Sequence, residues 1–587
     1  MINTPLWRLD EIVLALGDAI VKSKYRGDTG LDRDEQCYYS VTSDSHDVQD
    51  SAIFIGLRGK NFNGNIFAFA ALQSGAKLAI IDDLSVIHHE LYNKYKEYIL
   101  FVNNSYDALI KLAKFARQRL PKAQVIAITG SAGKTTTKEM IRYVLSDDAN
   151  KLHGHGSQPN AHHNSINDAD NIGNAENLDN MSNTNNITKA HRKVFATKGN
   201  KNNTIGVPLM LVNCPNDADF VVLELAMSNK GEIRFLSSLV LPHIAIITNI
   251  FACHMQSFQN IDEIALAKAE ILENIVEGGK AILNADSRYY DKFKSIVEKR
   301  KADVISFGES SASMMQVISY SESVNKDYSD VQVSYMGERI DYKTEFCGKY
   351  LIYNSLIALL IDRIYGDIKC NNSDGSGDSS SNSNNKRKND VAEEYGGFLG
   401  FKPLTGRGNI NIIIVGNNSG DDGESGNRDD DGGSDGSSNG NGGNSSKILL
   451  IDDSYNANYE AVIQALLRAS SYKKGDGGSG DSGGRLIAIL GDMLGLGMHE
   501  KELHRLLGEN ITKNFKTLDL LFTVGELMQK YLVPEITIPV TSFADSGAAA
   551  RYYEDKKQEL FRDGDVVLVK GSRDMHMEKV VSSILSN

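Results

Sequence analysis

A short glycine-rich segment has the residue types that bind phosphate. It has the sequence TGSAGKTT at residues 129–136 and follows an apolar run at 125–128. Glycines let a turn aim its backbone N–H groups inward, a lysine supplies a cation, and a threonine hydroxyl at a helix N-terminus can ligate Mg²⁺. We therefore predict that this segment holds the phosphates of a nucleotide. The candidate contacts are Gly130, Ser131, Ala132, Gly133, Lys134, Thr135 and Thr136.

The spacing of the segment departs from the commonest phosphate loop. The GxxxxGK[ST] pattern requires glycine at position 128, where the chain has Ile128. The alternative is an ordinary glycine turn between a strand and a helix. A Gly-Lys-Thr-Thr run directly after an apolar strand favours the phosphate loop.

Lys268 lies on the apolar side of an expected helix. At 100° per residue, Ile264, Ala267, Ile271 and Ile275 form one stripe, and Lys268 falls in its middle. Burial lowers the pKa of a lysine, and the neutral amine can react with carbon dioxide to give a carbamate, whose oxygens suit Mg²⁺. The alternative is a lysine that reaches out to solvent or pairs with a nearby acid.

Two further polar residues accompany apolar strands. Glu224 interrupts the strand sequence FVVLELAM, and His254 follows the strand sequence HIAIITNI within TNIFACHMQSF. Either residue alone is more often a satisfied polar residue than a ligand. Ligands of a parallel sheet bind at the carboxyl ends of its strands, so Glu224, His254, Lys268 and the phosphate loop are expected to converge. Together they favour a Mg²⁺-ATP site.

The composition places limits on compartment and partners. The chain has 587 residues, 41% hydrophobic and 24% charged, and a formal net charge of -13, which disfavours nucleic acid. Residues 1–20 are interrupted by acidic side chains and are expected to form an amphipathic helix rather than a signal peptide, and no uncharged run approaches the roughly 20 residues that span a membrane. The cysteines are scattered, which fits reduced thiols in a cytoplasmic protein. They are Cys37, Cys214, Cys253, Cys347 and Cys370.

Short apolar strands alternate with helical segments along most of the chain. This alternation predicts an α/β fold of three domains, in which a central parallel-sheet, P-loop ATPase-like domain is flanked by a small N-terminal α/β domain and a C-terminal Rossmann-like α/β domain. The predicted boundaries are 1–120, 121–365 and 366–587. Four segments poor in apolar residues are expected to be disordered insertions in surface loops. They are residues 147–190, 371–390, 416–446 and 474–484.

At this point the motifs resemble those of the Mur ligase family, the ATP-dependent amide-forming enzymes of peptidoglycan precursor synthesis. One such string alone would be weak evidence, whereas many in order along nearly the whole chain are specific. The strings are TGSAGKTTTKE, KNNTIGVPL, LELAMSNKGEI, TNIFACHMQSF, ALAKAEI, LNAD, LTGRG, IDDSYNAN, LGDML and VLVKGSRDMHME.

The resemblance implies a reaction. ATP phosphorylates the carboxylate of UDP-N-acetylmuramoyl-tripeptide, and the amine of D-Ala-D-Ala attacks the acyl phosphate and releases phosphate. Lys134 and the loop would hold the phosphates, Thr135 and Glu224 one Mg²⁺, and His254 with carbamylated Lys268 a second. Cations that screen both anions and stabilise the transferring phosphoryl group suit this chemistry.

The resemblance also implies ligand contacts. The nucleotide contacts would be Asn249, Asn354, Arg407 and, at the ribose, Asp453. The first domain would bind the UDP part of the substrate through a segment containing Ser43, Asp44 and Ser45. The remaining substrate contacts would be Thr197, Asn202, Asn203, Asn456 and Asn458. The chain departs from the family pattern at His46, Tyr350, Tyr459 and Gly495.

Three alternatives remain at this stage. A sibling ligase that adds a diamino acid would carry an Asp-Asn-Pro-Arg motif, which the chain lacks. A folylpolyglutamate-type ligase shares the ATP machinery but would not explain the N-terminal segment TSDSHDV. A P-loop switch that hydrolyses ATP without ligation is the alternative from another class. We expect a monomeric cytoplasmic enzyme that acts on small molecules without inserting into a membrane.

Overall fold

The computed structural model describes thirteen stretches of the chain, and structural statements below concern these residues. They are 4–21, 37–59, 62–86, 89–146, 192–253, 255–321, 329–345, 348–365, 393–398, 401, 404–415, 446–473 and 484–586. His254 lies outside them, as do the four predicted insertions apart from the boundary residues Ser446 and Gly484.

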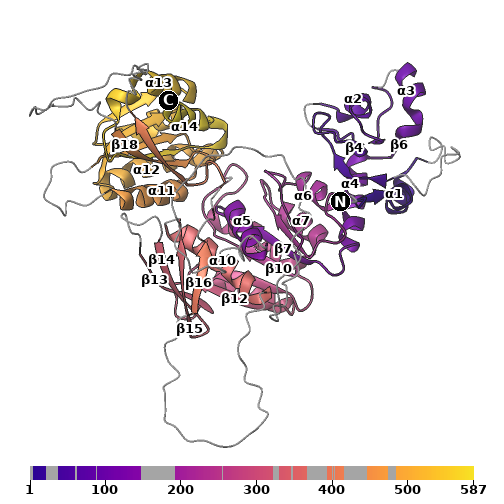
Figure 1. Ribbon diagram of the computed structural model, residues 1–587, viewed down its shortest axis with the longest axis horizontal. Helices are drawn as coiled ribbons and strands as arrows, with labels where there is room; N and C mark the ends of the chain where they lie inside the picture. Colours follow the sequence, from indigo (N-terminus) through magenta and orange to yellow (C-terminus); the bar gives the residue numbers. More distant parts are fainter. Residues whose placement is uncertain are drawn as a thin grey trace, which may run out of the picture.

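Three large α/β units are arranged in a V, with the N-terminal and C-terminal units at the two tips and the central unit at the base (Figure 1). The N-terminal sheet has four parallel strands in the order β3-β4-β5-β6. Its strands are β3 (Ser40–Thr42), β4 (Ala52–Ile55), β5 (Leu78–Ile81) and β6 (Ile99–Phe101). A separate short pair joins β1 (Trp7–Arg8) to β2 (Cys37–Tyr38). The predicted three-domain α/β architecture is confirmed.

The central sheet has ten described strands in the order β16-β15-β14-β13-β12-β11-β10-β7-β9-β8. The strands from β12 to β8 in this order are parallel, and β13, β14 and β15 form an antiparallel meander. The bounds are β7 (Gln124–Thr129), β8 (Val194–Ala196), β9 (Phe220–Glu224), β10 (Ile244–Ile247), β11 (Lys280–Asn284), β12 (Asp303–Gly308), β13 (Met315–Ser321), β14 (Ser329–Tyr335), β15 (Glu338–Thr344) and β16 (Glu393–Phe398). Because β16 pairs with β15, the central sheet extends beyond residue 365, where the predicted central domain ended.

Both faces of the central sheet are buried, which explains the unbroken apolar run in β7. Ile126 and Ile128 pack in a core with helices α5 (Lys134–Leu145) and α10 (Lys349–Tyr365). Val125 and Ala127 point to the opposite core, which contains helices α6 (Gly206–Val212), α7 (Glu232–Val240) and α8 (Ile261–Ala269). A strand covered on both faces needs no polar alternation.

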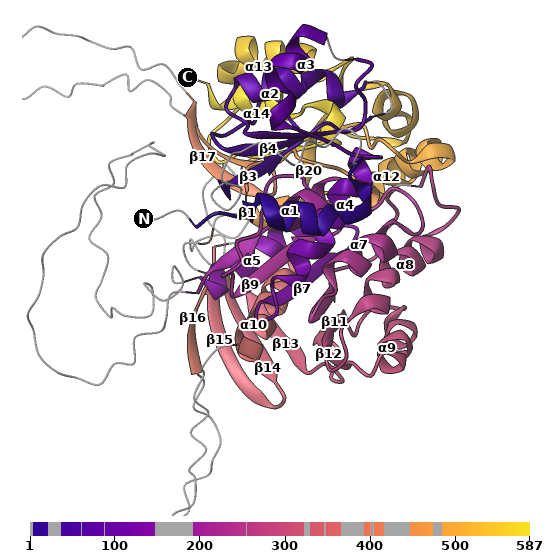
Figure 2. The same cartoon turned by 90° about the vertical axis from the view of Figure 1, so that its right-hand side faces the viewer.

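The second of these cores continues into the N-terminal unit. Figure 2 shows α1 (Leu9–Leu16) and α4 (Ser105–Gln118) between the N-terminal sheet and the central unit. The indole Nε1 of Trp7 donates a hydrogen bond to the carbonyl of Val212 in α6 at 2.8 Å. The expected amphipathic helix near the N-terminus is α1, which buries Ile12 and Leu16. Other helices of these two units are α2 (Ala68–Gln73), α3 (His89–Tyr95) and α9 (Tyr290–Lys299).

The C-terminal sheet has six described strands in the order β17-β18-β22-β19-β20-β21, parallel except for the pair β17–β18. Its strands are β17 (Asn409–Val415), β18 (Ser446–Asp453), β19 (Leu486–Gly491), β20 (Leu518–Val524), β21 (Val540–Phe543) and β22 (Val566–Lys570). Its helices are α11 (Tyr459–Tyr472), α12 (Glu500–Asn514), α13 (Ser546–Leu560) and α14 (Glu578–Leu585). Separate apolar cores cover its two faces, as a parallel sheet requires.

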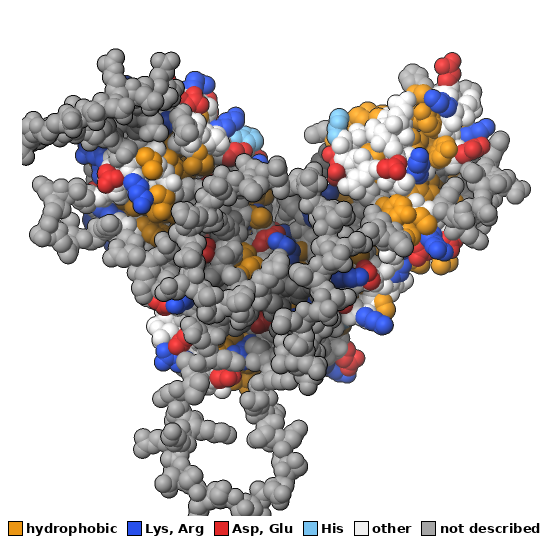
Figure 3. Space-filling view, in the orientation of Figure 1, with side chains coloured by type: hydrophobic (Ala, Val, Ile, Leu, Met, Phe, Trp, Pro, Cys, Tyr) orange, Lys and Arg blue, Asp and Glu red, His pale blue; other side chains and the backbone are white. Residues whose placement is uncertain are grey.

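The visible surface carries charges of both signs. On the coloured parts of the face in Figure 3, Lys and Arg side chains are interspersed with Asp and Glu. No helix within the described ranges is long and apolar enough to cross a membrane.

Candidate active site

The phosphate loop follows β7 at the carboxyl edge of the central sheet. Gly130 has a φ of +153°, and a Cβ there would lie 1.9 Å from Oγ1 of Thr248, which follows the neighbouring strand β10. That hydroxyl donates to the carbonyl of Ala132 at 2.7 Å. Position 130 therefore requires glycine, because Thr248, which follows β10, lies too close to the loop to leave room for a side chain.

Two asparagines, Asn249 and Asn354, lie against the loop. The side chain of Asn249 accepts from the Ala132 N–H at 2.8 Å and donates to the Ala132 carbonyl at 3.1 Å. Gly133 caps α5 with a φ of +77°, and a Cβ there would lie 2.8 Å from Oδ1 of Asn354. Asn249 and Asn354, both predicted to contact the nucleotide, thus lie next to the loop. The side-chain amide of Asn249 is hydrogen-bonded to the loop backbone.

Lys268 is buried beneath the loop, with 2% of its surface exposed. Its Nζ donates to the carbonyl of Gly130 at 3.0 Å, and Nζ of Lys134 donates to the same carbonyl at 2.9 Å. Burial lowers the pKa of Lys268 to about 8, the nearby Cys253 thiol opposes this shift, and Lys134 adds to it. The buried placement predicted from the helical stripe is confirmed, and a lysine that reaches solvent is not observed.

Glu224 ends β9 next to the loop and is 2% exposed. Its carboxylate accepts from Thr135 Oγ1 at 2.7 Å and from Asn202 Nδ2 at 2.9 Å. Its backbone N–H donates to Thr197 Oγ1 at 2.9 Å. A buried carboxylate held by a hydroxyl and an amide offers oxygen ligands of the kind that Mg²⁺ takes.

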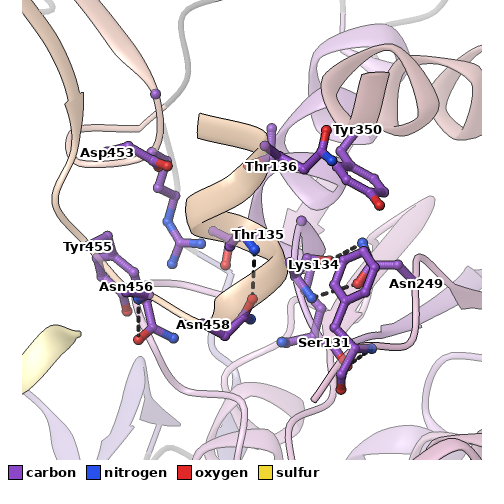
Figure 4. A pocket seen from close by; sticks show the side chains of 18 of the residues that line it. Ser131, Lys134, Thr135, Thr136, Asn249, Tyr350, Asp453, Tyr455, Asn456 and Asn458 are labelled. Atoms are coloured by element: carbon purple, nitrogen blue, oxygen red, sulfur yellow. Dashed lines mark hydrogen bonds between the residues drawn. The ribbon is translucent and has the colours of Figure 1, made fainter. Parts of the chain in front are cut away.

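These groups line a cavity of about 510 Å³ between the central and C-terminal units. Figure 4 shows Ser131, Lys134 and Asn249 on one side and Asp453, Tyr455 and Asn456 on the other. The predicted residues that line the cavity are Ser131, Ala132, Gly133, Lys134, Thr135, Thr136, Asn202, Asn203, Glu224, Asn249, Asn354, Arg407, Asp453, Asn456 and Asn458. A parallel sheet brings the loops after β7, β9 and β10 to this edge.

The remaining predicted residues lie elsewhere. Gly130, Thr197 and Lys268 are not part of the lining. Gly130 contacts Lys134 and Thr197 contacts Glu224, both of which line the cavity, whereas Lys268 contacts Gly130. Ser43, Asp44 and Ser45 follow β3 in the N-terminal unit and do not line the cavity, so the structure does not join them to the other predicted residues. Asp44 accepts a hydrogen bond from the N–H of His46 at 2.9 Å, which forms a local turn.

Several predicted substrate contacts also have structural partners. The side chain of Asn203 accepts from the Gly206 N–H at 2.8 Å at the start of α6. Asn458 caps α11 by accepting from the Ala461 N–H at 2.8 Å. These two asparagines therefore also stabilise the starts of helices, which accounts for part of the sequence pattern that predicted substrate contacts at positions 203 and 458.

The C-terminal wall contains the cations Lys570 and Arg573, which the sequence reasoning missed, beside the predicted Arg407. Nζ of Lys570 lies 2.6 Å from Asp453 Oδ2 and donates to the Asn456 carbonyl at 2.8 Å. The guanidinium of Arg407 lies 3.8 Å from the ring centroid of Tyr455, and that of Arg573 lies 5.4 Å from it. Lys570 ends the apolar strand VVLVK. The sequence argument that singled out Glu224, a charged residue on a buried strand, would also have singled out Lys570.

Three departures from the expected family pattern have structural settings. Tyr350 lines the cavity, with its ring centroid 5.1 Å from that of Phe251. Tyr459 begins α11, and its hydroxyl accepts from Asn510 at 3.1 Å. Gly495 has a φ of +75°, a backbone conformation that favours glycine over residues with a side chain.

Comparisons with known proteins agree with this arrangement. The model of the Mur ligase middle domain matches residues 128–361, and that of the Mur ligase, glutamate ligase domain matches residues 442–573. Together they cover more than half of the chain and most of the residues that line the cavity. The chain belongs to the Mur ligase family.

Relatives within this family match the Mur ligase chain over nearly its full length. The UDP-N-acetylmuramoyl-tripeptide–D-alanyl-D-alanine ligase of Rickettsia prowazekii is 26% identical over 556 residues, covering 92% of this chain and 94% of that protein. The enzyme of the same name from Escherichia coli is 25% identical and covers 93% of this chain and 94% of that protein.

Solved structures show the same fold. MurF from Acinetobacter baumannii has a TM-score of 0.69 at 21% identity, with both chains fully covered. MurF ligase from Thermotoga maritima, in complex with ADP, has a TM-score of 0.63 at 21% identity and covers 94% of this chain and 98% of that chain.

Proposed function

We propose that this Mur ligase joins D-alanyl-D-alanine to UDP-N-acetylmuramoyl-tripeptide in an ATP-dependent reaction. The observation that carries the proposal is the shared cavity, in which Lys134 and Glu224 from the central unit face Arg407 from the C-terminal unit. Full-length relatives named for this reaction support the choice of substrates. In this proposal the protein acts in peptidoglycan precursor synthesis.

The chemistry proceeds in two steps. A carboxylate oxygen of the tripeptide attacks the γ-phosphorus of ATP, the bond to the ADP oxygen breaks, and an acyl phosphate forms. The dipeptide amine then attacks the acyl carbon, the C–N bond forms, the bond to phosphate breaks, and the amine loses a proton. Lys134, Arg407 and the loop N–H groups stabilise the negative charge on the transferring phosphoryl group.

The oxygen donors of Thr135 and Glu224 fit a magnesium ion. Their separation of 2.7 Å places a hydroxyl and a buried carboxylate at the phosphate loop, and we propose that they hold Mg²⁺. Bound there, Mg²⁺ would neutralise phosphate charge. We also propose that Lys268, as a carbamate, and His254 serve a second ion. The low pKa of the buried amine supports carbamate formation.

The remaining contacts complete the proposal. Arg407 would contact ATP phosphate and Asp453 its ribose, while Asn249 and Asn354 would contact the nucleotide. Asn202, Asn203, Asn456 and Asn458 line the cavity, and we propose that they contact the substrates. Thr197 supports Glu224 from behind.

Each of the three units would bind a different substrate. We propose that residues 1–120 bind the UDP part of the substrate through Ser43, Asp44 and Ser45, that the central unit binds ATP, and that the C-terminal unit presents the dipeptide. The enzyme would act as a cytoplasmic monomer. Its closure would bring Arg407 toward the phosphates.

The test is incubation of the full-length protein with ATP, Mg²⁺, UDP-muramoyl-tripeptide and D-Ala-D-Ala, with mass detection of the pentapeptide. We expect product and phosphate in equal amounts, both dependent on the dipeptide. Phosphate release without any dipeptide requirement and without amide product would instead support an ATPase switch.

A further inference from the structure

The cavity contains more cations than phosphoryl transfer accounts for. Its lining includes Lys134, Lys349, Arg407, Arg468, Lys570 and Arg573. A ligase that adds a dipeptide must also receive an anion on its second substrate, the dipeptide carboxylate. One of these cations is therefore expected to bind that group.

Four of the cations are committed to other groups. Lys134 donates to the loop carbonyl of Gly130, and Lys570 is paired with Asp453. Arg468 is buried and donates from Nη1 to the Gly408 carbonyl at 2.9 Å, which braces the turn that carries Arg407. Lys349 lies on the central unit and pairs with Glu309 at 2.8 Å.

Arg573 differs in position and in exposure. It lies just after β22 on the C-terminal wall, and 54% of its side chain is exposed. Its ion pair with Glu578, at 3.4 Å, joins two exposed groups and contributes at most about 1 kcal/mol. Arg573 can therefore exchange this partner for a ligand at little cost.

The loop that carries Arg573 is rigidly held. Ser572 Oγ accepts from the Leu494 N–H at 2.8 Å, and the Ser572 N–H donates to the Asp492 carbonyl at 3.2 Å. Arg407 and Arg573 both lie over the ring of Tyr455, at 3.8 Å and 5.4 Å from its centroid. The wall thus presents a second guanidinium beside the one assigned to phosphate.

We propose that Arg573 binds the carboxylate of the incoming dipeptide and makes the enzyme selective for a substrate with a free C-terminus. This inference rests on the proposed ligase function. A planar guanidinium matches a carboxylate with two parallel hydrogen bonds, which a lysine does not provide. Anchored at its carboxylate, the dipeptide directs its amine into the cavity.

The test compares D-Ala-D-Ala with D-Ala-D-alaninamide, which keeps the amine and removes the negative charge. For the full-length wild type we expect kcat/KM for the acid to exceed that for the amide by at least about 30-fold. In Arg573→Gln this preference should fall to about threefold or less, with the KM for ATP within about twofold of wild type. Arg551→Gln, at an exposed position outside the cavity, is the matched control and should keep the wild-type preference.

Each other outcome has a defined meaning. A wild-type enzyme that uses acid and amide equally, or an Arg573→Gln variant that keeps the wild-type preference, overturns the role of Arg573. A rise in the KM for ATP with unchanged acid preference assigns Arg573 to phosphate instead and also overturns it. If Arg573→Gln fails to fold, Arg573→Lys decides, because a single ammonium should reduce the acid preference several-fold. Absence of any wild-type pentapeptide refutes the ligase function itself.

Discussion

Lys134 and Lys268 donate to the same backbone carbonyl, that of Gly130, although they lie on different helices. Lys134 begins α5 and faces the cavity, whereas Lys268 approaches from α8 and is buried. Burial lowers the pKa of Lys268, and the positive charge of Lys134 adds a smaller shift in the same direction. The buried position thus gives Lys268 an amine that can react.

Carbamate formation at Lys268 should depend on pH. The reactive form is the neutral amine, whose fraction rises as pH increases through about 8. In ¹³C-bicarbonate, at constant dissolved carbon dioxide, we expect a carbamate ¹³C NMR signal that grows between about pH 7 and 9. Lys268→Ala should lack this signal and should lose most ligase activity. An alanine variant with full activity would exclude the carbamate from the mechanism.

Lys268 should also affect stability with a defined sign. Its folded-state pKa of about 8 lies below the usual lysine pKa of 10.5, so the unfolded chain binds more protons between these values. The free energy of unfolding should therefore rise with pH across this window relative to Lys268→Met. Urea unfolding of both proteins at several pH values measures the difference. Parallel pH profiles would contradict the lowered pKa.

Gly130→Ala should disrupt the phosphate loop. The new Cβ would lie 1.9 Å from Thr248 Oγ1, so the loop or β10 must shift. We expect ATP affinity to fall by at least about tenfold, because the N–H groups no longer converge. Gly278→Ala is the control, since its φ of +73° is similarly restrictive but nothing lies within 4 Å. It should lose about 1 kcal/mol of stability while retaining ATP affinity in calorimetry.

Glu224→Gln should weaken metal binding with little change in packing. Glutamine has the same shape, can still accept from Thr135, and lacks the negative charge that attracts Mg²⁺. We expect the Mg²⁺ concentration at half-maximal activity to rise by about tenfold or more. Glu139→Gln, next to Lys138 in α5, provides a control outside the cavity. Equal Mg²⁺ requirements in wild type and Glu224→Gln would argue against this ligand.

Lys570→Met should destabilise the C-terminal wall. Removal of the ammonium leaves the Asp453 carboxylate without its partner at 2.6 Å, and we expect a loss of about 1–3 kcal/mol in urea unfolding. Asp453→Asn combined with Lys570→Met should recover part of this loss, which a double-mutant cycle measures. Additive losses would show that the two groups are not coupled.

Local sequence determined the elements and much of the site. The apolar runs of β7, β9 and β10 required strands covered on both faces, and the helical stripe around Lys268 required a buried amine. The glycine-rich run after β7 could form only a tight turn ahead of a helix. These features depend on the periodicity of apolar residues and on the free-energy cost of burying a charge. Both can be read from residues that are close together in the sequence.

Tertiary structure alone decided which groups meet. The pair Asp453–Lys570 is formed by neighbouring parallel strands that are far apart in the sequence, and Arg573 joins the cavity through the same sheet edge. The addition of β16 to the central sheet likewise depended on pairing with β15 rather than on local pattern. Strand order and register are set by contacts across the sheet, and no single segment of sequence contains both partners of such a contact.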